Sequence, residues 1–375
     1  MEKANNIFLE IKKENRNRIF NKIREAGSIS RPALARELEL SMPTVTQNLA
    51  ELVDLGYICD SGSVGHTGGR RAKVYSVAAN RKAAIGVDLT RNRISVIAAD
   101  LNGTVVFQSE TNIPFSKSEE YFQVLGKQVT DAANQAKINA EDILGVGIAL
   151  PALITEDHER IFYGTILDIT DMTVQMFGKY IPYPCRLYND ADAAGYAEIS
   201  HDQELSSAFY IGLNNNIGGA VLIDHNVYKG QSPRSGEVGH LTIIPGGRLC
   251  YCGQKGCLEC YCNADVLASQ CNGKLDAFFE QLGKEDTECV KIWKDYLDHL
   301  AIAVNNVRML FDCDIILGGY VGGYMEPYLP QLKQLVLQRN PFDKTADFLR
   351  VCRVKHEALA LGSALPYIHE FWKDI

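Results

Sequence analysis

The chain contains 375 residues, of which 46% are hydrophobic and 22% are charged, and its net charge is −8. Such a composition supports two or three folded domains and excludes a largely disordered chain. The longest apolar runs, Ala83–Leu89 and Leu144–Leu153, are far shorter than a membrane span, and the polar N-terminus shows no signal peptide. We therefore expect a cytoplasmic protein with no membrane partner.

Charge is distributed unevenly along the chain. Residues 1–80 contain 12 lysines and arginines against 9 acidic residues, a net charge of +3, so the remaining residues carry −11. A mildly basic module attached to an acidic body indicates that this module contacts nucleic acid.

Two helices joined by a tight turn are predicted near the N-terminus. Ser30 and Ser41 are each followed two residues later by proline, which marks two helix starts, and Gly56 ends the second helix. The second helix is predicted to bury four apolar side chains, those of Val45, Leu49, Leu52 and Val53. Two predicted strands, 57–59 and 72–77, flank the glycine-rich loop Ser61–Arg71, so the unit is predicted to be a winged helix.

The exposed face of this second helix is predicted to contact DNA bases in the major groove. Glutamine and asparagine can read adenine edges in the major groove, and serine and threonine can contact bases or phosphates. The candidates on the helix are Ser41, Thr44, Thr46, Gln47 and Asn48. Arg70 and Arg71, at the end of the wing loop, are candidates for the minor groove or the phosphates, with a solvated charge pair as the alternative.

Two later segments share one pattern about 124 residues apart. Residues 84–107 and 208–229 each read as a strand, a polar turn, a second strand, a hairpin and a third strand. Helices are predicted at Glu119–Lys137 and Cys289–Phe311, and the second runs into a strand at Asp314–Gly319. We therefore predict an α/β body made of two similar lobes.

Five of the eleven cysteines fall within 13 residues, which favours a metal site over a disulfide framework. The segment Gly236-Glu237-Val238-Gly239-His240 is followed by Cys250-Tyr251-Cys252-Gly253-Gln254-Lys255-Gly256-Cys257-Leu258-Glu259. One imidazole and three thiolates, those of His240, Cys250, Cys252 and Cys257, can supply a tetrahedral structural zinc. Cys260 and Cys262 are rival ligands, which we expect on the following helix and pointing away from the metal.

These two motifs resemble those of the ROK family (repressors, open-reading-frame proteins and sugar kinases). With a winged helix ahead of them, the chain is similar to the family's xylose-type and N-acetylglucosamine-type repressors from about Asn15 to the C-terminus. The resemblance implies an N-terminal winged helix-turn-helix followed by two actin-like or sugar-kinase-like (ribonuclease-H-like) lobes with a cleft between them. The expected domains are residues 1–80, residues 81–190, and residues 191–375 with the zinc loop and a C-terminal helix that returns to the first lobe.

The resemblance also implies a sugar site. Asn189 and Asp190 end a predicted strand, where an amide and a carboxylate suit sugar hydroxyls, although a helix cap is the alternative. Asp190 matches the general base of the family's kinases, and Asn189, Glu237, His240 and Glu259 match residues that grip other hydroxyls. His240 would place one ring nitrogen on zinc and the other toward the sugar.

The family's kinases need glycine-rich turns that approach the phosphates of ATP. This chain has Asp88-Leu89-Thr90-Arg91-Asn92-Arg93 in the first lobe and Asn214-Asn215-Asn216 in the second, and only Gly318-Gly319 matches the family's adenosine-side pair. Asparagine side chains fill the space that a phosphate would need. The sequence therefore predicts a retained sugar pocket and a lost phosphate site.

Together these features predict a sugar-responsive transcriptional regulator, a repressor of carbohydrate-utilisation genes with no enzymatic activity. Its expected partners are operator DNA, a sugar or sugar derivative, and further copies of itself in a homodimer or tetramer. One alternative is an active ATP-dependent sugar kinase that uses Asp190 as base and also carries a DNA-binding domain. The other is a zinc-stabilised scaffold without a ligand.

Overall fold

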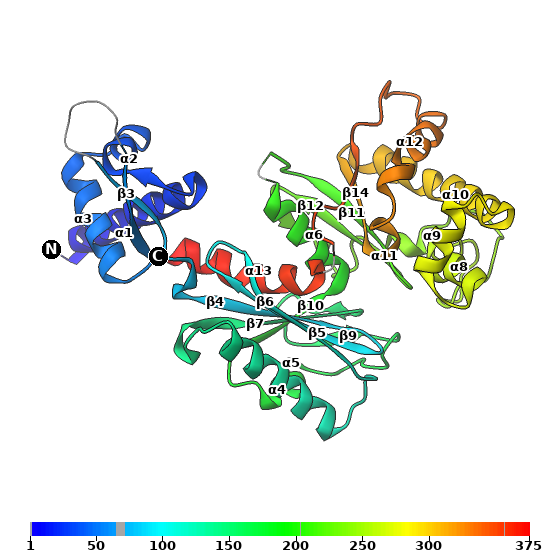
Figure 1. Cartoon of the computed structure of the whole chain (residues 1–375), viewed down its shortest axis with the longest axis horizontal. Helices are drawn as coiled ribbons and strands as arrows, with labels where there is room; N and C mark the ends of the chain where they lie inside the picture. Colours follow the sequence, from blue (N-terminus) through cyan, green and yellow to red (C-terminus); the bar gives the residue numbers. More distant parts are fainter. Residues whose placement is uncertain (1, 65–71, 203, 356) are drawn as a thin grey trace.

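The computed structural model describes residues 2–64, 72–202, 204–355 and 357–375. Within these ranges, every helix is too short or too polar to traverse a lipid bilayer. Three parts follow one another along the chain: a small N-terminal domain and two α/β lobes, with the last helix running back to the N-terminal domain (Figure 1).

The N-terminal domain is a winged helix. Its elements are α1 (Glu2–Ala26), β1 (Ile29–Ser30), α2 (Arg31–Glu37), α3 (Met42–Asp54), β2 (Ile58–Val64) and β3 (Ala72–Val77), and the strands pair antiparallel in the order β1-β3-β2. Ser30 and Ser41 cap α2 and α3, each by accepting a hydrogen bond from the backbone N–H three residues on. The caps and the following prolines place both helix starts where the sequence predicts them.

One prediction about the buried face of α3 is wrong. Val45, Leu49 and Leu52 are buried as expected, but Val53 is 43% exposed and Asn48 takes the fourth place on the buried stripe. Positions 45, 48, 49 and 52 lie on one side of a helix with 3.6 residues per turn, and the fit of α3 against α1 and α2 selects this side.

The two lobes repeat one sheet topology. The first sheet has the order β10-β7-β4-β5-β6, and the second has the order β13-β12-β11-β14-β15. In each, three strands adjacent in sequence form an antiparallel meander, and two later strands add in parallel. The first sheet comprises β4 (Ala83–Leu89), β5 (Arg93–Asp100), β6 (Val105–Asn112), β7 (Ile143–Leu150) and β10 (Cys185–Asn189). The second comprises β11 (Ala208–Leu213), β12 (Ile217–Ile223), β13 (Asn226–Val227), β14 (Asp314–Gly318) and β15 (Leu349–Val351). The predicted α/β repeat is confirmed.

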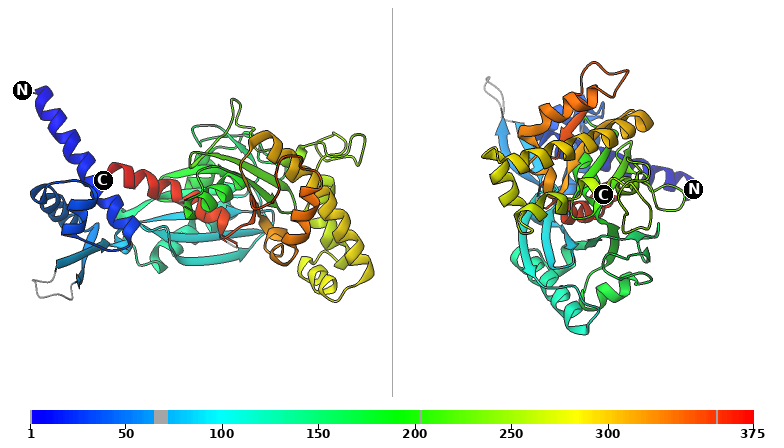
Figure 2. Two further views of the ribbon diagram at one scale, coloured as in Figure 1. Left: turned by 90° about the horizontal axis from the view of Figure 1, so that it is seen from above. Right: turned by 90° about the vertical axis from the view of Figure 1, so that its right-hand side faces the viewer.

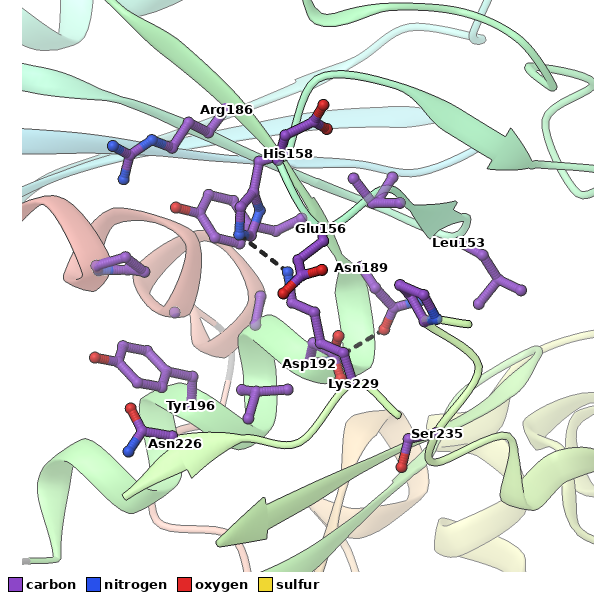
Figure 3. Close-up of a pocket in the computed structure, with 18 of the residues that line it drawn as sticks. Leu153, Glu156, His158, Arg186, Asn189, Asp192, Tyr196, Asn226, Lys229 and Ser235 are labelled. Carbon is purple, nitrogen blue, oxygen red and sulfur yellow. Dashed lines mark hydrogen bonds between the residues drawn. The ribbon is translucent and has the colours of Figure 1, made fainter. Parts of the chain in front are cut away.

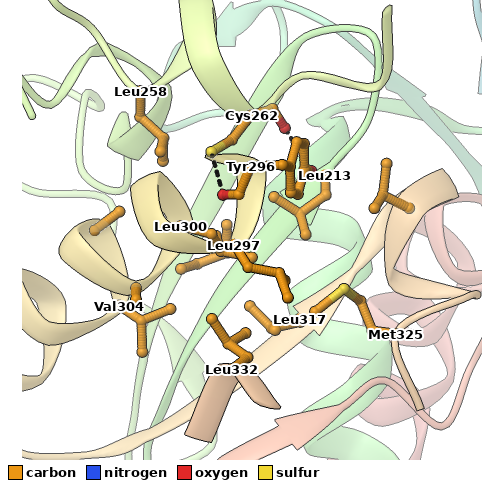
Figure 4. Packing of buried hydrophobic residues seen from close by; sticks show 14 of the residues in the cluster. Leu213, Leu258, Cys262, Tyr296, Leu297, Leu300, Val304, Leu317, Met325 and Leu332 are labelled. Carbon is orange, nitrogen blue, oxygen red and sulfur yellow. Dashed lines mark hydrogen bonds between the residues drawn. The ribbon is translucent and has the colours of Figure 1, made fainter. Parts of the chain in front are cut away.

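Helices cover both sheets. The first lobe carries α4 (Glu119–Gln135), α5 (Val174–Phe177) and the small hairpin β8 (Leu153–Ile154) and β9 (Ile161–Tyr163). The second carries α7 (Glu259–Cys262), α8 (Ala264–Ala268), α9 (Leu275–Gly283), α10 (Thr287–Phe311), α11 (Gly319–Gly322) and α12 (Leu329–Leu337). In its core, Leu297 and Leu300 of α10 lie among side chains of the sheet and of α12, such as Leu317 and Leu332 (Figure 4). This core holds the second lobe together independently of the first.

Two helices connect the three parts. α6 (Asp190–His201) packs against α13 (Ala358–Asp374) and against the second sheet, while α13 packs on the first sheet. The contact of α13 is close because Gly86 and Gly147 lack side chains: a Cβ at either position would lie 1.9 Å from a carbonyl oxygen of α13. The C-terminal end of α13 lies beside the winged helix (Figures 1 and 2). The last helix therefore contacts both the first lobe and the winged helix.

Candidate functional site

A small cavity of about 60 Å³ lies between the lobes, and we call it the central cavity. It is lined by the ends of β7 and β10, by the hairpin β8–β9, by the start of β12 and by the turn Val238–His240. Four of the five predicted sugar-binding residues line it, namely Asn189, Asp190, Glu237 and His240. They come from both lobes, so a molecule held here would contact both.

Asn189 and Asp190 serve the helix that follows them as well as the cavity. Asn189 caps α6, since its side-chain oxygen accepts from the N–H of Asp192 at 3.0 Å, and its amide donates to the carbonyl of Ala152 at 3.0 Å. Burial raises the pKa of Asp190, whose carboxylate accepts from the N–H of Ala191 at 2.8 Å. Asn189 therefore caps α6, as the alternative interpretation predicted. The same cap fixes the side chains of Asn189 and Asp190 at the cavity wall.

Glu237 and His240 meet on the second-lobe side of the cavity. Their side chains approach to 4.0 Å, and His240 Nε2 lies 3.2 Å from the hydroxyl of Tyr251. Burial and the nearby carboxyl group of Asp190 together raise the pKa of Glu237 to about 7. Two carboxyl groups and an imidazole thus face one small space, an arrangement that can bind several hydroxyl groups.

The structure does not place Glu259 at the cavity. Its side chain is only 3% exposed and lies at the start of α7. The carboxylate accepts from the backbone N–H of Ile217 at 2.6 Å and from the amides of Asn216 and Asn263 at 3.3 and 3.4 Å. These bonds occupy a buried carboxylate that does not line the central cavity in this structure, and contact of Glu259 with a sugar stays a prediction. The carboxylate anchors the first residues of β12.

The predicted metal ligands form one cluster. The ligand atoms of His240, Cys250, Cys252 and Cys257 all lie within 4.8 Å of one another. Cys252 Sγ is 3.8 Å from Cys257 Sγ, close to the separation of about 3.8 Å that two zinc–sulfur bonds of about 2.3 Å make at a tetrahedral angle. The donor set and its spacing therefore fit a tetrahedral ion of the zinc type.

The loop geometry explains how the ligands meet. Gly253 and Gly256 have φ of +86° and +84°, which glycine adopts freely, and they reverse the chain between Cys252 and Cys257. His240 turns Nδ1 toward Cys250, 3.8 Å from its sulfur, and Nε2 toward the central cavity. This arrangement matches the expectation that one ring nitrogen faces the metal and the other the ligand.

The two rival cysteines lie outside the cluster of four. Cys262 is buried in the second core, where its sulfur lies 3.6 Å from the carbonyl of Tyr296 (Figure 4). Cys260 is half-buried and lies next to Cys250, on the short helix α7. Cys260 therefore stays the nearer substitute for a ligand, and a metal assay on its variant can separate the two assignments.

The side of the cleft where nucleotide would bind in a kinase has a cavity of about 320 Å³ between the turns 88–93 and 214–216. Asn214 accepts from the N–H of Tyr320 at 2.9 Å, and its oxygen lies 2.6 Å from where a Cβ on Gly319 would be. Asn216 donates to Glu259. None of the three asparagines has a positive φ. Two of their side chains thus bond to residues outside the turn, and that of Asn214 lies against Gly319.

The candidate DNA-reading residues divide on α3. Ser41, Thr46 and Gln47 are exposed and Thr44 is half-exposed, whereas Asn48 is 3% exposed. Asn48 donates to the carbonyl of Thr44 at 2.8 Å and faces the domain core, so the prediction that it lies on the exposed face is wrong. Arg70 and Arg71 lie outside the described residues.

Comparison with known proteins then settles the family. A family model described as "ROK family" matches residues 84–365. The chain belongs to the ROK family.

Its relatives include regulators and kinases. It is 25% identical over 94% of its length to the putative xylose repressor of Caldicellulosiruptor sp. (strain Rt8B.4), of which it covers 94%. It is 28% identical over 68% of its length to the xylose repressor of Bacillus subtilis, of which it covers 67%. Both relatives are named as repressors.

Solved structures show the same fold. A ROK family transcriptional regulator, described as a homologue of the Escherichia coli MLC protein, superposes with a TM-score of 0.76 at 21% identity and 97% coverage of both chains. The ROK hexokinase of Thermus thermophilus superposes with a TM-score of 0.62 at 25% identity, covering 77% of this chain and 99% of the kinase. The regulator thus matches nearly the whole chain, and the kinase matches a part about as long as the two lobes.

A second, larger cavity of this ROK protein was not predicted from the sequence. This lateral cavity, of about 470 Å³, shares Leu153, Asn189 and Glu237 with the central cavity. Its wall is formed by the β8–β9 connection, α6, the segment after β13, and α13. Lys229 of the second lobe donates to Nε2 of His158 of the first lobe at 3.0 Å (Figure 3). No local motif marks these residues, since they come from distant segments.

Contacts of α13 connect the lateral cavity to the winged helix. The hydroxyl of Tyr196, a lining residue of α6, shares a hydrogen bond of 2.5 Å with His369 Nδ1. The ring of His369 lies 4.5 Å from that of Trp372, and the guanidinium carbon of Arg24, in α1, lies 3.9 Å from the Trp372 ring. Trp372 also donates to the carbonyl of Leu101 at 3.0 Å. A continuous series of packed side chains therefore runs from the cavity to the N-terminal domain.

The ionisation of Asp192, in the lateral cavity, gives a testable pH dependence. Burial raises its pKa to about 7, with the ammonium of Lys229 opposing the shift. Because an unfolded aspartate has a pKa of about 3.9, the folded state holds an extra proton between these values, and the associated stability is lost as the pH rises through about 7. In the wild type, loss of this proton should lower the free energy of unfolding by about 1 kcal/mol between about pH 6 and about pH 8. This contribution should be absent in Asp192→Asn.

Urea unfolding at the two pH values measures this difference. Burial lowers the pKa of His158, His240 and His369, which changes stability in the opposite direction, so the comparison is between variant and wild type rather than with a flat profile. Asp224→Asn, at an exposed turn, should keep the wild-type pH dependence. An Asp192→Asn protein with the wild-type dependence would contradict the raised pKa.

Proposed function

We propose that this ROK family protein is a transcriptional repressor of carbohydrate-utilisation genes whose affinity for operator DNA changes when a sugar binds between its lobes. The observation that carries this proposal is the combination of a winged helix with a cleft that keeps Asn189, Asp190, Glu237 and His240 on its sugar side. On the nucleotide side, the side chain of Asn214 lies against Gly319, the second glycine of the retained pair. Sugar binding without phosphate transfer is the property of a sensor.

The names of the relatives support the same function. The matched relatives named as xylose repressors and as N-acetylglucosamine repressors are regulators that respond to carbohydrate, to judge from those names. We propose that this chain likewise binds a sugar or sugar derivative. Because operator DNA lies in the bacterial cytoplasm, the proposed function also places the protein there.

Zinc is the proposed structural cofactor. His240, Cys250, Cys252 and Cys257 offer the four donors, and the second nitrogen of His240 faces the central cavity. The ion would crosslink the loop that carries His240 to the loop that carries the three cysteines. Its role is to hold the second-lobe wall of the sugar site in place, rather than to take part in a reaction.

For DNA we propose that Ser41, Thr44, Thr46 and Gln47 contact the major groove and that Arg70 and Arg71 contact the minor groove or phosphates. A winged helix that reads a palindrome acts in pairs, so we propose a homodimer or tetramer. The division into residues 1–80, 81–190 and 191–375 assigns DNA binding to the first part and ligand binding to the other two. Closure of the lobes would then change the spacing of the paired winged helices.

A mobility-shift experiment tests the proposal. An operator is first selected from random-sequence DNA, and its affinity is then measured with glucose, xylose, N-acetylglucosamine and disaccharides of these sugars. We expect one neutral sugar to change the affinity by about tenfold, within the usual range of allosteric coupling. Asp190→Asn should remove this change, whereas the exposed Asp224→Asn should not. An operator affinity that no sugar alters would contradict the proposal.

A sugar kinase is the second candidate, and one observation favours it. Asp190 lines both the central cavity and the cavity between the turns 88–93 and 214–216, which is where a base would activate a hydroxyl toward a nucleotide. A coupled assay of ATP consumption with the same sugars decides between the two functions. We expect no turnover above background, and a turnover that Asp190→Asn abolishes would establish the kinase instead.

A further inference from the structure

We infer that the effector is a neutral disaccharide, with one ring in the central cavity and the second ring in the lateral cavity. This inference rests on the proposed sugar-sensing function and extends it to the size and charge of the ligand. The lateral cavity adjoins the site that the sequence motifs mark, but apart from Asn189 and Glu237 its lining residues belong to none of these motifs.

The two cavities share part of their wall. Leu153, Asn189 and Glu237 line both, so a ligand that contacts Asn189 and Glu237 from the central cavity can extend past Leu153 into the lateral one. The central cavity measures about 60 Å³ and the lateral cavity about 470 Å³. Most of the space available to a ligand therefore lies beyond the residues that the family motif supplies, within the range of about 300–1,000 Å³ typical of small-molecule sites.

The lining of the lateral cavity suits a carbohydrate. Tyr188 and Tyr196 provide aromatic surfaces, and the ring of His158 lies 4.5 Å from that of Tyr188. Asp192, Asn226 and Ser235 add an anionic acceptor, an amide and a hydroxyl at separate points of the wall (Figure 3). Apolar faces combined with a few dispersed hydrogen-bonding groups are what a sugar ring, with its C–H faces and peripheral hydroxyls, requires.

The charges of the wall disfavour a phosphorylated or acidic sugar. Five carboxyl groups line the lateral cavity together with the side chains of Arg186, Lys229 and Lys373. Arg186 already binds Glu370 at 2.5 Å. Burial lowers the pKa of Lys229, and the carboxyl groups of Asp192, Glu156 and Asp157 around it oppose that shift. An anion placed beside Lys229 would therefore also face these carboxyl groups, so the cavity favours a neutral ligand.

A second ring in this position would also reach the contacts that lead to the DNA-binding domain. Lys229 and His158 join the two lobes across the cavity, and Tyr196 connects its wall to His369 of α13. A single ring confined to the central cavity touches none of these side chains, since none of them lines it. A ligand as long as a disaccharide is therefore needed to connect sugar binding in the two cavities to α13.

Titration calorimetry on the full chain tests the inference with matched sugar pairs. The probes are glucose with cellobiose and maltose, xylose with xylobiose, N-acetylglucosamine with N,N′-diacetylchitobiose, and glucose 6-phosphate as an anionic arm. We expect one disaccharide to bind at least about tenfold more tightly than its monosaccharide, and glucose 6-phosphate to bind no better than glucose.

Two variants show where the second ring lies. Val227→Phe fills part of the lateral cavity from β13 and should lower the affinity of that disaccharide at least about tenfold while leaving the monosaccharide within about twofold. Val227→Leu should give an intermediate loss. Ile223→Phe places the same aromatic ring at an exposed position of the same hairpin, outside the cavity, and should change neither affinity.

The outcomes separate this inference from the proposed function. If every disaccharide binds no better than its monosaccharide, or if folded Val227→Phe weakens both equally, the second-ring site is overturned. If in that case a monosaccharide still shifts operator affinity, the proposed sensor function stands on its own. If no sugar of either size binds, the proposed function fails, and this inference fails with it.

Discussion

Replacement of Cys252 by serine is expected to reduce bound zinc from about one ion per chain to almost none and to abolish the response of operator affinity to sugar. Cys252 supplies one of four ligand atoms that lie within 4.8 Å of one another, and a hydroxyl is a much poorer zinc ligand than a thiolate. Without the ion, the loop that carries His240 loses its crosslink to the cysteine loop. Metal content by mass spectrometry and mobility shift measure the two effects.

The neighbouring cysteines supply the controls for this experiment. Cys271→Ser changes a half-buried cysteine outside the cluster and should retain zinc and the sugar response. Cys260→Ser should also retain zinc, because Cys260 lies beside Cys250 but outside the group of four. Zinc that persists in Cys252→Ser and is lost in Cys260→Ser would show that Cys260 is the fourth ligand.

Replacement of Trp372 by alanine is expected to uncouple sugar binding from DNA binding. The variant should bind sugar within about twofold of wild type, while the ratio of operator affinities with and without sugar, expected to lie between about 5 and 150, should fall toward 1. The physical reason is that Trp372 connects His369 to Arg24 and fixes α13 to Leu101 through its indole N–H. Calorimetry and mobility shift on the same preparation give both quantities.

Graded and remote variants test whether this uncoupling is specific. Trp372→Phe keeps an aromatic ring but loses the indole N–H, and it should retain part of the coupling. Phe342→Ala removes an 80% exposed aromatic ring from the second lobe, away from this contact series, and should leave coupling intact. If Trp372→Ala keeps the full sugar effect on DNA affinity, the signal does not pass through this end of α13.

His369 lies between Tyr196 and Trp372 in this series of contacts, and its imidazole is neutral near pH 7. Burial lowers its pKa to about 4, and the positive charges of Arg24, Lys373 and His201 add to that effect. Nδ1 of a neutral imidazole can accept a hydrogen bond from the Tyr196 hydroxyl, whereas a protonated imidazole carries hydrogen on both ring nitrogens and cannot accept one. The contact between the cavity wall and α13 therefore does not depend on pH near neutrality.

The local features of this protein were predictable because each depends on a short stretch of sequence. Helix caps at Ser30 and Ser41, with proline in the first turn, set the start of α2 and α3. The metal ligands lie within a few turns of one another, and the reversal between Cys252 and Cys257 needs only the glycines between them. The repeated strand pattern likewise gave the two lobes, because hairpin pairing joins neighbouring segments.

Predictions about where a side chain points were less secure. For α3, placing Val53 rather than Asn48 on the buried face was wrong, because two adjacent faces of a helix fit nearly the same apolar spacing and only packing against α1 and α2 selects one. For Glu259, the motif gave the residue but not its direction. The backbone N–H of Ile217 and two asparagine amides hold its carboxylate away from the cavity.

The sequence alone determined the family, the winged helix, the composition of the cluster of His240, Cys250, Cys252 and Cys257, and the absence of glycine from the turns 88–93 and 214–216, since each depends on contiguous residues. The tertiary structure decided what lies around them. Distant segments meet at the lateral cavity, at the contact of Lys229 with His158 and in the series that ends at Arg24. Some of these segments lie about 350 residues apart, and the hydrogen bond from Asn21 to Trp372 spans a separation of 351. No local propensity records such a meeting, because only the packing of α13 between the first sheet, α6 and α1 brings these side chains together.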